Sequence, residues 1–232
     1  MEKKITIAID AMGGDNSPDK TISGVSIFLE KNKSKNDFFL KLYGDEKLIN
    51  NSLKKYKIDY KKISVIHTSS SVSDDETPLT AIKNSRDTSM WKCINSQLDG
   101  DSDISLSAGN TGVLLVISRM ILKMMKKVNK PALAGLWPNE KDMSVVLDLG
   151  ANIECGENNL IDFSELGSAL YKSLYPSKKP VVSLLNIGSE EIKGTETLKK
   201  TFSKLKELSN DDNFIFNGYI EGNRIMDGDS NV

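Results

Sequence analysis

The sequence predicts an α/β fold in which a mainly parallel sheet lies between two layers of helices. Apolar, β-rich runs alternate along the chain with stretches of helical periodicity. Several of those runs are continuous rather than alternating, which is typical of strands covered on both faces. Glycine, asparagine and short acidic residues follow most of the runs, as in the loops of such sheets.

The elements follow from these patterns in chain order. The runs are rich in β-branched and aromatic residues, and we expect strands at 3–9, 38–44, 63–68, 103–109, 131–137, 144–150, 181–188 and 213–222. Apolar residues three and four positions apart predict helices at 18–33, 45–56, 77–98, 111–127, 158–174 and 190–208. The strands at 131–137 and 144–150, joined by PNEKDM, are expected to form an antiparallel hairpin.

Composition limits the class of protein. The chain has 232 residues, with 31 Lys and Arg against 32 Asp and Glu, so the net charge of -1 argues against a globally basic nucleic-acid binder. No window reaches the roughly 18 to 20 apolar residues of a membrane-spanning helix, and the apolar run near the N-terminus is too short for a signal peptide. We expect a cytoplasmic protein in which residues 1–232 form a single α/β domain.

The cysteines and the histidine indicate neither a metal site nor a covalent nucleophile. Cys93 and Cys155 have no thiol or imidazole at metal-ligand spacing, and reduced structural thiols are the favoured interpretation. The single histidine, His67, has no catalytic signature around it, and we expect it to end a strand and bond to nearby backbone. No metal and no cofactor is predicted.

Six loops gather polar residues after the predicted strands, at 10–16, 44–46, 107–112, 148–152, 186–194 and 221–224. Open α/β sheets place their ligand crevice at the carboxyl ends of the strands, so a shared site is favoured over unrelated turns. The residues predicted to bind substrate or phosphate are Asp10, Gly13, Gly14, Asp15, Ser107, Gly109, Thr111, Gly112, Asp148 and Gly188. Asp10, Asp15 and Asp148 are too scattered to define a metal site, and we expect them to orient backbone or to cap turns.

The segment SAGNTG at 107–112 is the sharpest candidate for anion binding. It leads directly into a predicted helix, whose first amides would point at an anion. A tight turn with Thr111 as helix N-cap is an equally good interpretation. Neither a Walker A loop nor a GxGxxG fingerprint is present. Lys193 is a candidate phosphate contact, with an exposed helix lysine as the alternative.

Seven motifs carry a resemblance to a known family. They are DAMGGDNSP at 10–18, ETPLTAIK at 76–83, TSMW at 88–91, SAGNTG at 107–112, KPALAGLWP at 130–138, VVLDLGAN at 145–152 and LLNIGSEEIKG at 184–194. Together, in this order, they resemble the bacterial phosphate acyltransferase (PlsX) family of phospholipid synthesis. The resemblance runs from about Ile5 to the last residue.

The resemblance implies transfer of a fatty acyl group from acyl carrier protein to inorganic phosphate, which yields acyl-phosphate. It also implies a fold similar to isocitrate and isopropylmalate dehydrogenases, a homodimer and peripheral membrane contact. Lys83 stands where the family usually has arginine, and Thr88 where it has serine. The chain ends before the family's next strand, so we expect a C-terminally truncated and inactive polypeptide.

Phosphate is itself a nucleophile and a thiolate is a good leaving group, so the expected reaction needs no covalent intermediate. We expect the SAGNTG amides and Lys193 to hold phosphate, and Asn110, Asn152 or Asn186 to stabilise the oxyanion. The basic segment at 119–130 is the candidate docking surface for the acidic carrier protein, through Arg119, Lys123, Lys126 and Lys127. Its apolar residues are equally consistent with buried core. A non-catalytic phosphate- or carrier-protein-binding fragment remains the alternative function.

Overall fold

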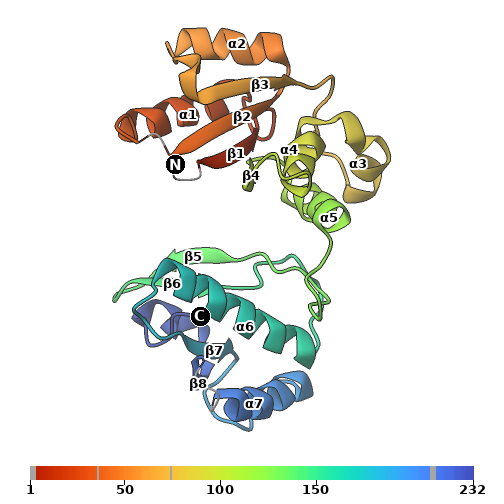
Figure 1. Ribbon diagram of the computed structural model, residues 1–232. Coiled ribbons are helices and arrows are strands. Elements are labelled where there is room, and N and C mark those ends of the chain that lie inside the picture. The colour runs from red at the N-terminus through yellow and green to blue at the C-terminus, as the bar shows by residue number, and fades with distance from the viewer. Residues whose placement is uncertain (1–3, 36, 74, 210–212) are drawn as a thin grey trace. The chain divides into compact units, whose positions relative to one another are not determined.

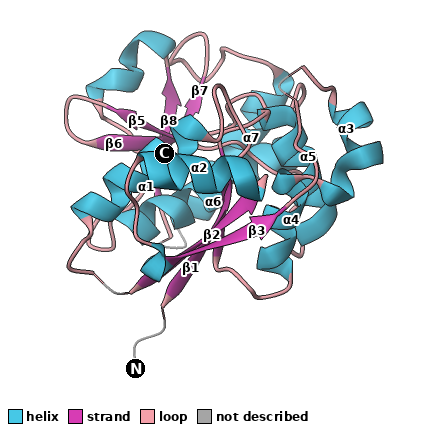
Figure 2. Ribbon diagram, turned by 90° about the horizontal axis from the view of Figure 1, so that it is seen from above, coloured by secondary structure: helices cyan, strands magenta, loops and turns pink. Residues whose placement is uncertain are grey.

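The structure is a computed structural model that describes residues 4–35, 37–73, 75–209 and 213–232. The chain forms two compact units, unit 1 at Met1–Lys123 and unit 2 at Met124–Val232. That residues 1–232 form a single domain stays a prediction. Both units alternate helices with strands (Figure 2), and most strand pairs are parallel, which confirms the predicted α/β class.

Unit 1 contains a parallel sheet with the strand order β3-β2-β1-β4 (Figure 1). Its elements are β1 (Ile5–Asp10), α1 (Asp19–Lys31), β2 (Phe38–Gly44), α2 (Glu46–Lys55), β3 (Ile63–His67), α3 (Pro78–Asn84), α4 (Ser89–Leu98), β4 (Ile104–Ser107) and α5 (Thr111–Leu122). β1 and β4 are adjacent, so their carboxyl ends, and the loops that follow them, meet at one edge of the sheet.

Helices cover both faces of this sheet. Leu40 and Leu42 of β2 pack with Ile49 of α2 in one buried cluster. Tyr43, on the opposite face of the same strand, packs with Cys93 of α4 in another. Since successive residues of a strand point to opposite faces, the two clusters place helices above and below the sheet. Unit 1 is therefore the three-layer arrangement that the continuous apolar runs predict.

The predicted helix at 77–98 is in fact two helices. Thr88 interrupts it, since its backbone is extended and its hydroxyl accepts a hydrogen bond from Trp91 N, as an N-cap does. The same hydroxyl donates to Ser85 O at 2.6 Å, so threonine fills the capping role at this position. The predicted helix at 111–127 likewise ends early, at Leu122, because Lys123 has φ 65°.

Unit 2 contains two short pairs of strands. Its elements are β5 (Gly135–Pro138), β6 (Met143–Val146), α6 (Glu157–Leu174), β7 (Val181–Leu185), α7 (Glu196–Leu208), β8 (Ile215–Ile220) and a 3₁₀ turn at Gly222–Asp227. β5 and β6 are antiparallel, which confirms the predicted hairpin, whereas β7 and β8 are parallel. Leu184, Leu205 and Phe214 are buried together between α7 and the β7-β8 pair.

Among the helices of the described ranges, none combines the length and the apolar character that a bilayer span demands.

Candidate functional site

The loops that follow β1 and β4 are tied together in unit 1 by one buried carboxylate. Asp10, the last residue of β1, is 2% exposed. Its Oδ2 accepts a hydrogen bond from Ser107 Oγ at 2.7 Å, and Ser107 Oγ accepts one from Gly109 N at 3.1 Å. Its Oδ1 accepts a longer one from Met12 N at 3.3 Å. Asp10 therefore orients the backbone of both loops, as expected from the sequence.

Burial dominates the electrostatics of Asp10. It raises the pKa of the carboxyl above its usual range, although hydrogen bonds from Ser107 and from the Met12 and Gly13 amides act in the opposite direction. Ser89, in the first turn of α4, is fully buried beside this carboxyl and also lowers its pKa. Within the described chain, however, its hydroxyl makes no hydrogen bond of regular geometry. Sequence reasoning missed Ser89, whose only signal was its place in the TSMW motif.

Glycine is required where the two loops touch. A Cβ on Gly13 would lie 2.7 Å from Asp10 Oδ2 and 2.8 Å from both Gly109 N and Ser107 Oγ. Gly14 has φ +87°, and its Cβ would lie 2.7 Å from Ala108 O. These glycines let one loop approach the other, a role that the sequence analysis did not distinguish from close approach to a ligand.

The second loop leads into the N-terminus of α5. The N-cap is Asn110 and not Thr111, because Asn110 Oδ1 accepts a hydrogen bond from Val113 N at 3.1 Å. Its Nδ2 donates to Glu76 O at 2.9 Å. Thr111 and Gly112 are exposed in the first turn, where helix amides lack an acceptor inside the helix. Such a terminus suits an anion. Asp15 lies exposed on the first loop.

A second carboxylate organises a loop of unit 2. Asp148 accepts hydrogen bonds from Leu133 N at 2.9 Å, Ala151 N at 3.1 Å, Asn152 N at 2.8 Å and Asn152 Nδ2 at 2.8 Å. Burial alone would raise the pKa of Asp148, but these hydrogen bonds outweigh it and the pKa is lowered. Asn152 Nδ2 also donates to Pro131 O at 2.7 Å, so both of its N–H groups hold the loop.

The loop after β7 brings together Asn186, Gly188 and Lys193, three residues that the sequence analysis selected. Asn186 is 8% exposed, and its Nδ2 donates to Lys193 O at 3.2 Å while its Oδ1 accepts from Ile187 N at 2.9 Å. The exposed Lys193 side chain lies over Gly188, where an added Cβ would meet Lys193 Cγ at 3.1 Å. A single loop thus carries the candidate oxyanion donor Asn186 and the candidate phosphate contact Lys193.

Neither thiol has the environment of a nucleophile. Burial raises the pKa of Cys93 to about 12, and burial is also the main cause of the raised pKa of Cys155. His67 Nδ1 accepts a hydrogen bond from Glu46 N at 3.3 Å, which confirms the expected backbone contact. Across the ranges that the structure describes, no three His, Cys, Asp or Glu residues are placed to hold a metal ion.

The predicted site residues fall into both units. Asp10, the paired glycines and SAGNTG belong to unit 1, and the Asp148 and Lys193 loops to unit 2. That SAGNTG and Lys193 form one phosphate site stays a prediction. All four predicted docking residues are exposed: Arg119, Lys123, Lys126 and Lys127. Met125 is 69% exposed in the same basic segment, whereas Ile121 is buried.

Comparison with known proteins confirms the resemblance. The family model described as "Fatty acid synthesis protein" matches residues 5–232. A phosphate acyltransferase of Pelagibacter ubique is 53% identical over 232 residues, which cover 100% of this chain and 68% of that protein. One of Bartonella henselae is 39% identical over 229 residues, 98% of this chain and 63% of that protein. The chain thus spans about two thirds of the length of these relatives.

Two solved structures share the fold. EutD phosphotransacetylase from Staphylococcus aureus has a TM-score of 0.66 at 13% identity, and covers 100% of this chain and 77% of its own. A phosphotransacetylase from Streptococcus pyogenes has a TM-score of 0.68 at 14% identity, with 99% and 74% covered. At these identities the likeness concerns the fold alone. Family model and curated relatives agree over the whole chain, which therefore belongs to the fatty acid synthesis protein family, alongside proteins named phosphate acyltransferase.

Proposed function

We propose that this chain takes part in the transfer of a fatty acyl group from acyl carrier protein to inorganic phosphate. The observation that carries the proposal is the locked pair of loops in unit 1, which ends at the amides of Thr111 and Gly112 on the N-terminus of α5. Such a terminus provides donors and a favourable dipole for phosphate. The relatives are named phosphate acyltransferase, and from this name we infer that an acyl group is the second reactant.

The reaction needs positioning more than a reactive side chain. A phosphate oxygen attacks the thioester carbonyl carbon, the new carbon–oxygen bond forms, and the carbon–sulfur bond breaks. Its electron pair leaves with the carrier-protein thiolate, and the product is acyl-phosphate. Holding phosphate in line with the carbonyl and stabilising the oxyanion would supply the rate enhancement. The protonated state of Cys93, with a pKa of about 12, supports direct attack.

Each predicted catalytic residue then has a proposed role. Lys193 supplies a mobile positive charge for phosphate from an exposed position over Gly188. Asn110 and Asn186 are the proposed oxyanion donors. Asn152 is the third proposed donor, and because Asp148 and Pro131 accept from both of its N–H groups, we also assign it to positioning its loop.

The finer features of the family complete the proposal. We infer a fold of the isocitrate and isopropylmalate dehydrogenase type, consistent with the parallel three-layer unit 1. The exposed cations Arg119, Lys123, Lys126 and Lys127 would meet the acidic carrier protein, and would do so less strongly at high salt. A homodimer in the cytoplasm with peripheral membrane contact belongs to the same proposal.

Phosphate binding is tested first, on the 232-residue chain. We expect phosphate to shift the backbone amide resonances of Gly109, Thr111 and Gly112 in a saturable way, whereas matched chloride does not. If phosphate causes no saturable shift, the proposed phosphate site of unit 1 is overturned. Saturable phosphate binding by a protein that never consumes acyl carrier protein thioester would favour the non-catalytic alternative.

The role of Lys193 is tested by steady-state kinetics with phosphate and acyl carrier protein thioester. Lys193→Ala is expected to raise the phosphate KM by more than about tenfold with little effect on carrier-protein affinity. Lys200→Ala removes an exposed lysine from α7 and serves as the matched control. An unchanged phosphate KM in Lys193→Ala would remove Lys193 from the site.

A further inference from the structure

A hollow of about 450 Å³ lies in unit 1, between residues 26–33 at the end of α1 and residues 56–62 before β3. Its volume falls in the range of roughly 300 to 1,000 Å³ that is usual for small-molecule sites. The two lining segments precede β2 and β3, whereas Asp10 is the last residue of β1. Because these three strands are parallel, the hollow and the Asp10 loops lie at opposite edges of the sheet.

Lysine side chains dominate the rim of this hollow. Residues 30–35 and 54–62 contain eight lysines but only two acids, Glu30 and Asp59, although the whole chain has a net charge of -1. Both acids line the hollow together with four of the lysines, namely Lys33, Lys57, Lys61 and Lys62. Four cations and two anions give the lining a net charge of +2. Such a concentration of positive charge attracts anions.

The two acids hold their lysine partners loosely. Lys33 Nζ lies 3.4 Å from Glu30 Oε1, and these side chains are 75% and 74% exposed. Lys61 Nζ lies 3.4 Å from Asp59 Oδ2, and these side chains are 86% and 65% exposed. Exposed pairs of this kind contribute little to stability. An anion can therefore bind either lysine without a large cost in lost ion pairs.

Lys57 occupies a position that usually belongs to glycine. Lys57 N donates to Lys54 O at 3.1 Å and Ile58 N donates to Leu53 O at 3.0 Å, which is the Schellman pattern that closes a helix. Lys57 has a φ of 53°, a conformation in which a side chain is strained and glycine is favoured. Its ammonium group forms no ion pair with any residue that the structure describes. Glycine would complete the same hydrogen bonds, so the backbone gives no reason for a lysine here.

The floor of the hollow is apolar and held in place. Leu29, Tyr56 and Ile58 are partly buried and pack against the core that α1 and α2 share with the sheet. Tyr56 OH donates to Asp19 Oδ2 at 3.0 Å, so the tyrosine ring has a fixed orientation. The hollow therefore joins a fixed apolar floor to a cationic rim.

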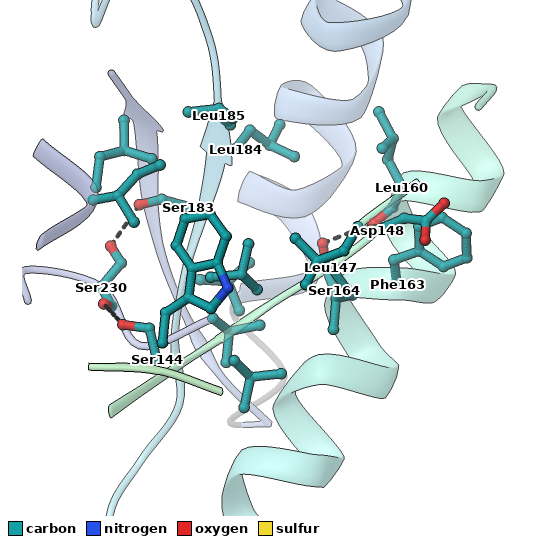
Figure 3. A pocket seen from close by; sticks show the side chains of 18 of the residues that line it. Ser144, Leu147, Asp148, Leu160, Phe163, Ser164, Ser183, Leu184, Leu185 and Ser230 are labelled. Atoms are coloured by element: carbon teal, nitrogen blue, oxygen red, sulfur yellow. Dashed lines mark hydrogen bonds between the residues drawn. The ribbon is translucent and has the colours of Figure 1, made fainter. Parts of the chain in front are cut away.

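The cavity of unit 2 has no cationic rim. It measures about 280 Å³ and is lined largely by apolar side chains such as Leu147, Leu160 and Phe163 (Figure 3). Among the described residues of its lining, Asp148 is the only charged one. That cavity offers no cation to an anion, so the hollow of unit 1 is the better candidate for an anionic ligand with an apolar part.

We propose that the hollow of unit 1 binds a phosphate monoester that carries an apolar tail. A phosphate monoester has a charge of about -2 at neutral pH, which balances the +2 of the lining, and its oxygens accept hydrogen bonds from lysines. A carboxylate or a sulfate ester has a single charge and balances only half of it. The apolar tail lies on Leu29 and Ile58. The inference does not rest on the proposed reaction, and the site is separate from the proposed phosphate site at α5.

Octyl phosphate, kept below its micelle-forming concentration, is the probe for this site. We expect it to shift the backbone amide resonances of Lys57 and Ile58 in the 232-residue chain in a saturable way. Octyl sulfate and inorganic phosphate should bind at least about tenfold more weakly, because the first lacks the second charge and the other lacks the tail. Shifts at Gly109, Thr111 and Gly112 report separately on the proposed phosphate site at α5.

Two variants test the lysines of the rim. The double variant Lys57→Gln, Lys61→Gln brings the charge of the lining to zero and should weaken octyl phosphate binding by more than about tenfold. Lys47→Gln removes an exposed lysine of α2 outside the hollow and is the matched control. Lys57→Gly removes one charge and relieves the positive φ, so binding should weaken while the urea midpoint of unfolding stays equal or rises. A purely structural role of Lys57 would not separate the two measurements in this way.

Several results would overturn the proposal. Equal binding of octyl sulfate would reject the phosphate monoester, and equal binding of inorganic phosphate would reject the role of the apolar floor. Unchanged octyl phosphate binding in the double variant would place the ligand elsewhere. Vesicles of phosphatidylcholine with and without phosphatidic acid present the same head group on a lipid surface. If the chain binds only the vesicles with phosphatidic acid, and no octyl phosphate, the rim is a membrane-docking surface and the small-molecule site is rejected.

Discussion

Asp10 in unit 1 and Asp148 in unit 2 hold loops in place by opposite electrostatic means. Asp10 is 2% exposed, and burial raises its pKa despite a 2.7 Å hydrogen bond from Ser107. Asp148 is half-buried and accepts four hydrogen bonds of 2.8 to 3.1 Å, which lower its pKa although burial acts against them. Burial disfavours the charged form of Asp10, whereas Asp148 stabilises its loop as an anion.

The difference shows that similar positions after strands do not imply similar energetics. Both aspartates precede glycine-containing loops, but the charge is stabilised only at Asp148, where the hydrogen bonds outweigh the effect of burial. The two residues should therefore give unit 1 and unit 2 stability changes of opposite sign with pH. Each unit has one tryptophan, Trp91 or Trp137, so single Trp→Phe variants let fluorescence report on each unit separately.

The largest effect is expected from Gly13→Ala, which tests how tightly the Asp10 loops are packed. The added methyl would meet Asp10 Oδ2 at 2.7 Å and Gly109 N at 2.8 Å. We expect a loss of about 3 kcal/mol in unit 1, measured by urea unfolding, with phosphate binding abolished. Gly24→Ala is the control, because an added Cβ there meets no atom within 4 Å beyond its chain neighbours and the backbone of its own helix, and alanine favours helix α1. Equal stability of the two variants would contradict the packing argument.

Asp148→Asn should destabilise unit 2 by about 2 kcal/mol near pH 7, because an amide cannot accept from all four donors. The native pKa is lowered below the usual value of 3.8, so the contribution of Asp148 is full above that pH and is lost as pH falls through the native pKa. The stability gap between the parent protein and the Asp148→Asn variant should therefore narrow in acid. Glu165→Gln, which replaces an exposed carboxylate on α6, should show no such difference in stability from the parent protein.

Asp10→Asn should change unit 1 by only about 1 kcal/mol, because an amide oxygen still accepts from Ser107 while the buried charge is removed. The native pKa is raised above 3.8, so the favourable contribution of Asp10 is full below that pH and declines as pH rises through the native pKa. As pH rises, the free energy of unfolding of the Asp10→Asn variant should increase relative to that of the parent protein. A relative loss over that range would mean that the Asp10 anion is stabilised as Asp148 is.

The smallest effect is expected from the double variant Cys93→Ala, Cys155→Ala. With a pKa of about 12, Cys93 is a thiol at neutral pH, and its loss should cost unit 1 less than about 1 kcal/mol. Phosphate-dependent consumption of the thioester should be retained. An acyl group found on either cysteine by mass spectrometry during turnover would contradict direct attack by phosphate.

Local sequence signals predicted the secondary structure well and its interruptions poorly. The strands lie within a few residues of the expected ranges, because β-branched apolar runs ended by glycine and asparagine are local features. The break at Thr88 was missed because apolar periodicity continues through it. The end of α5 was missed because the positive φ of Lys123 has no glycine to announce it.

The sequence by itself determined the order of strands and helices along the chain, the hairpin of β5 and β6, and the family. It also determined which loops carry polar residues. Only the tertiary structure decided what those polar residues do. Asp10 and Ser107 are 97 positions apart, and their hydrogen bond exists because β1 and β4 are neighbours. Burial and hydrogen-bond partners depend on residues distant in the chain, so the raised pKa of Asp10 and the lowered pKa of Asp148 have no local signature.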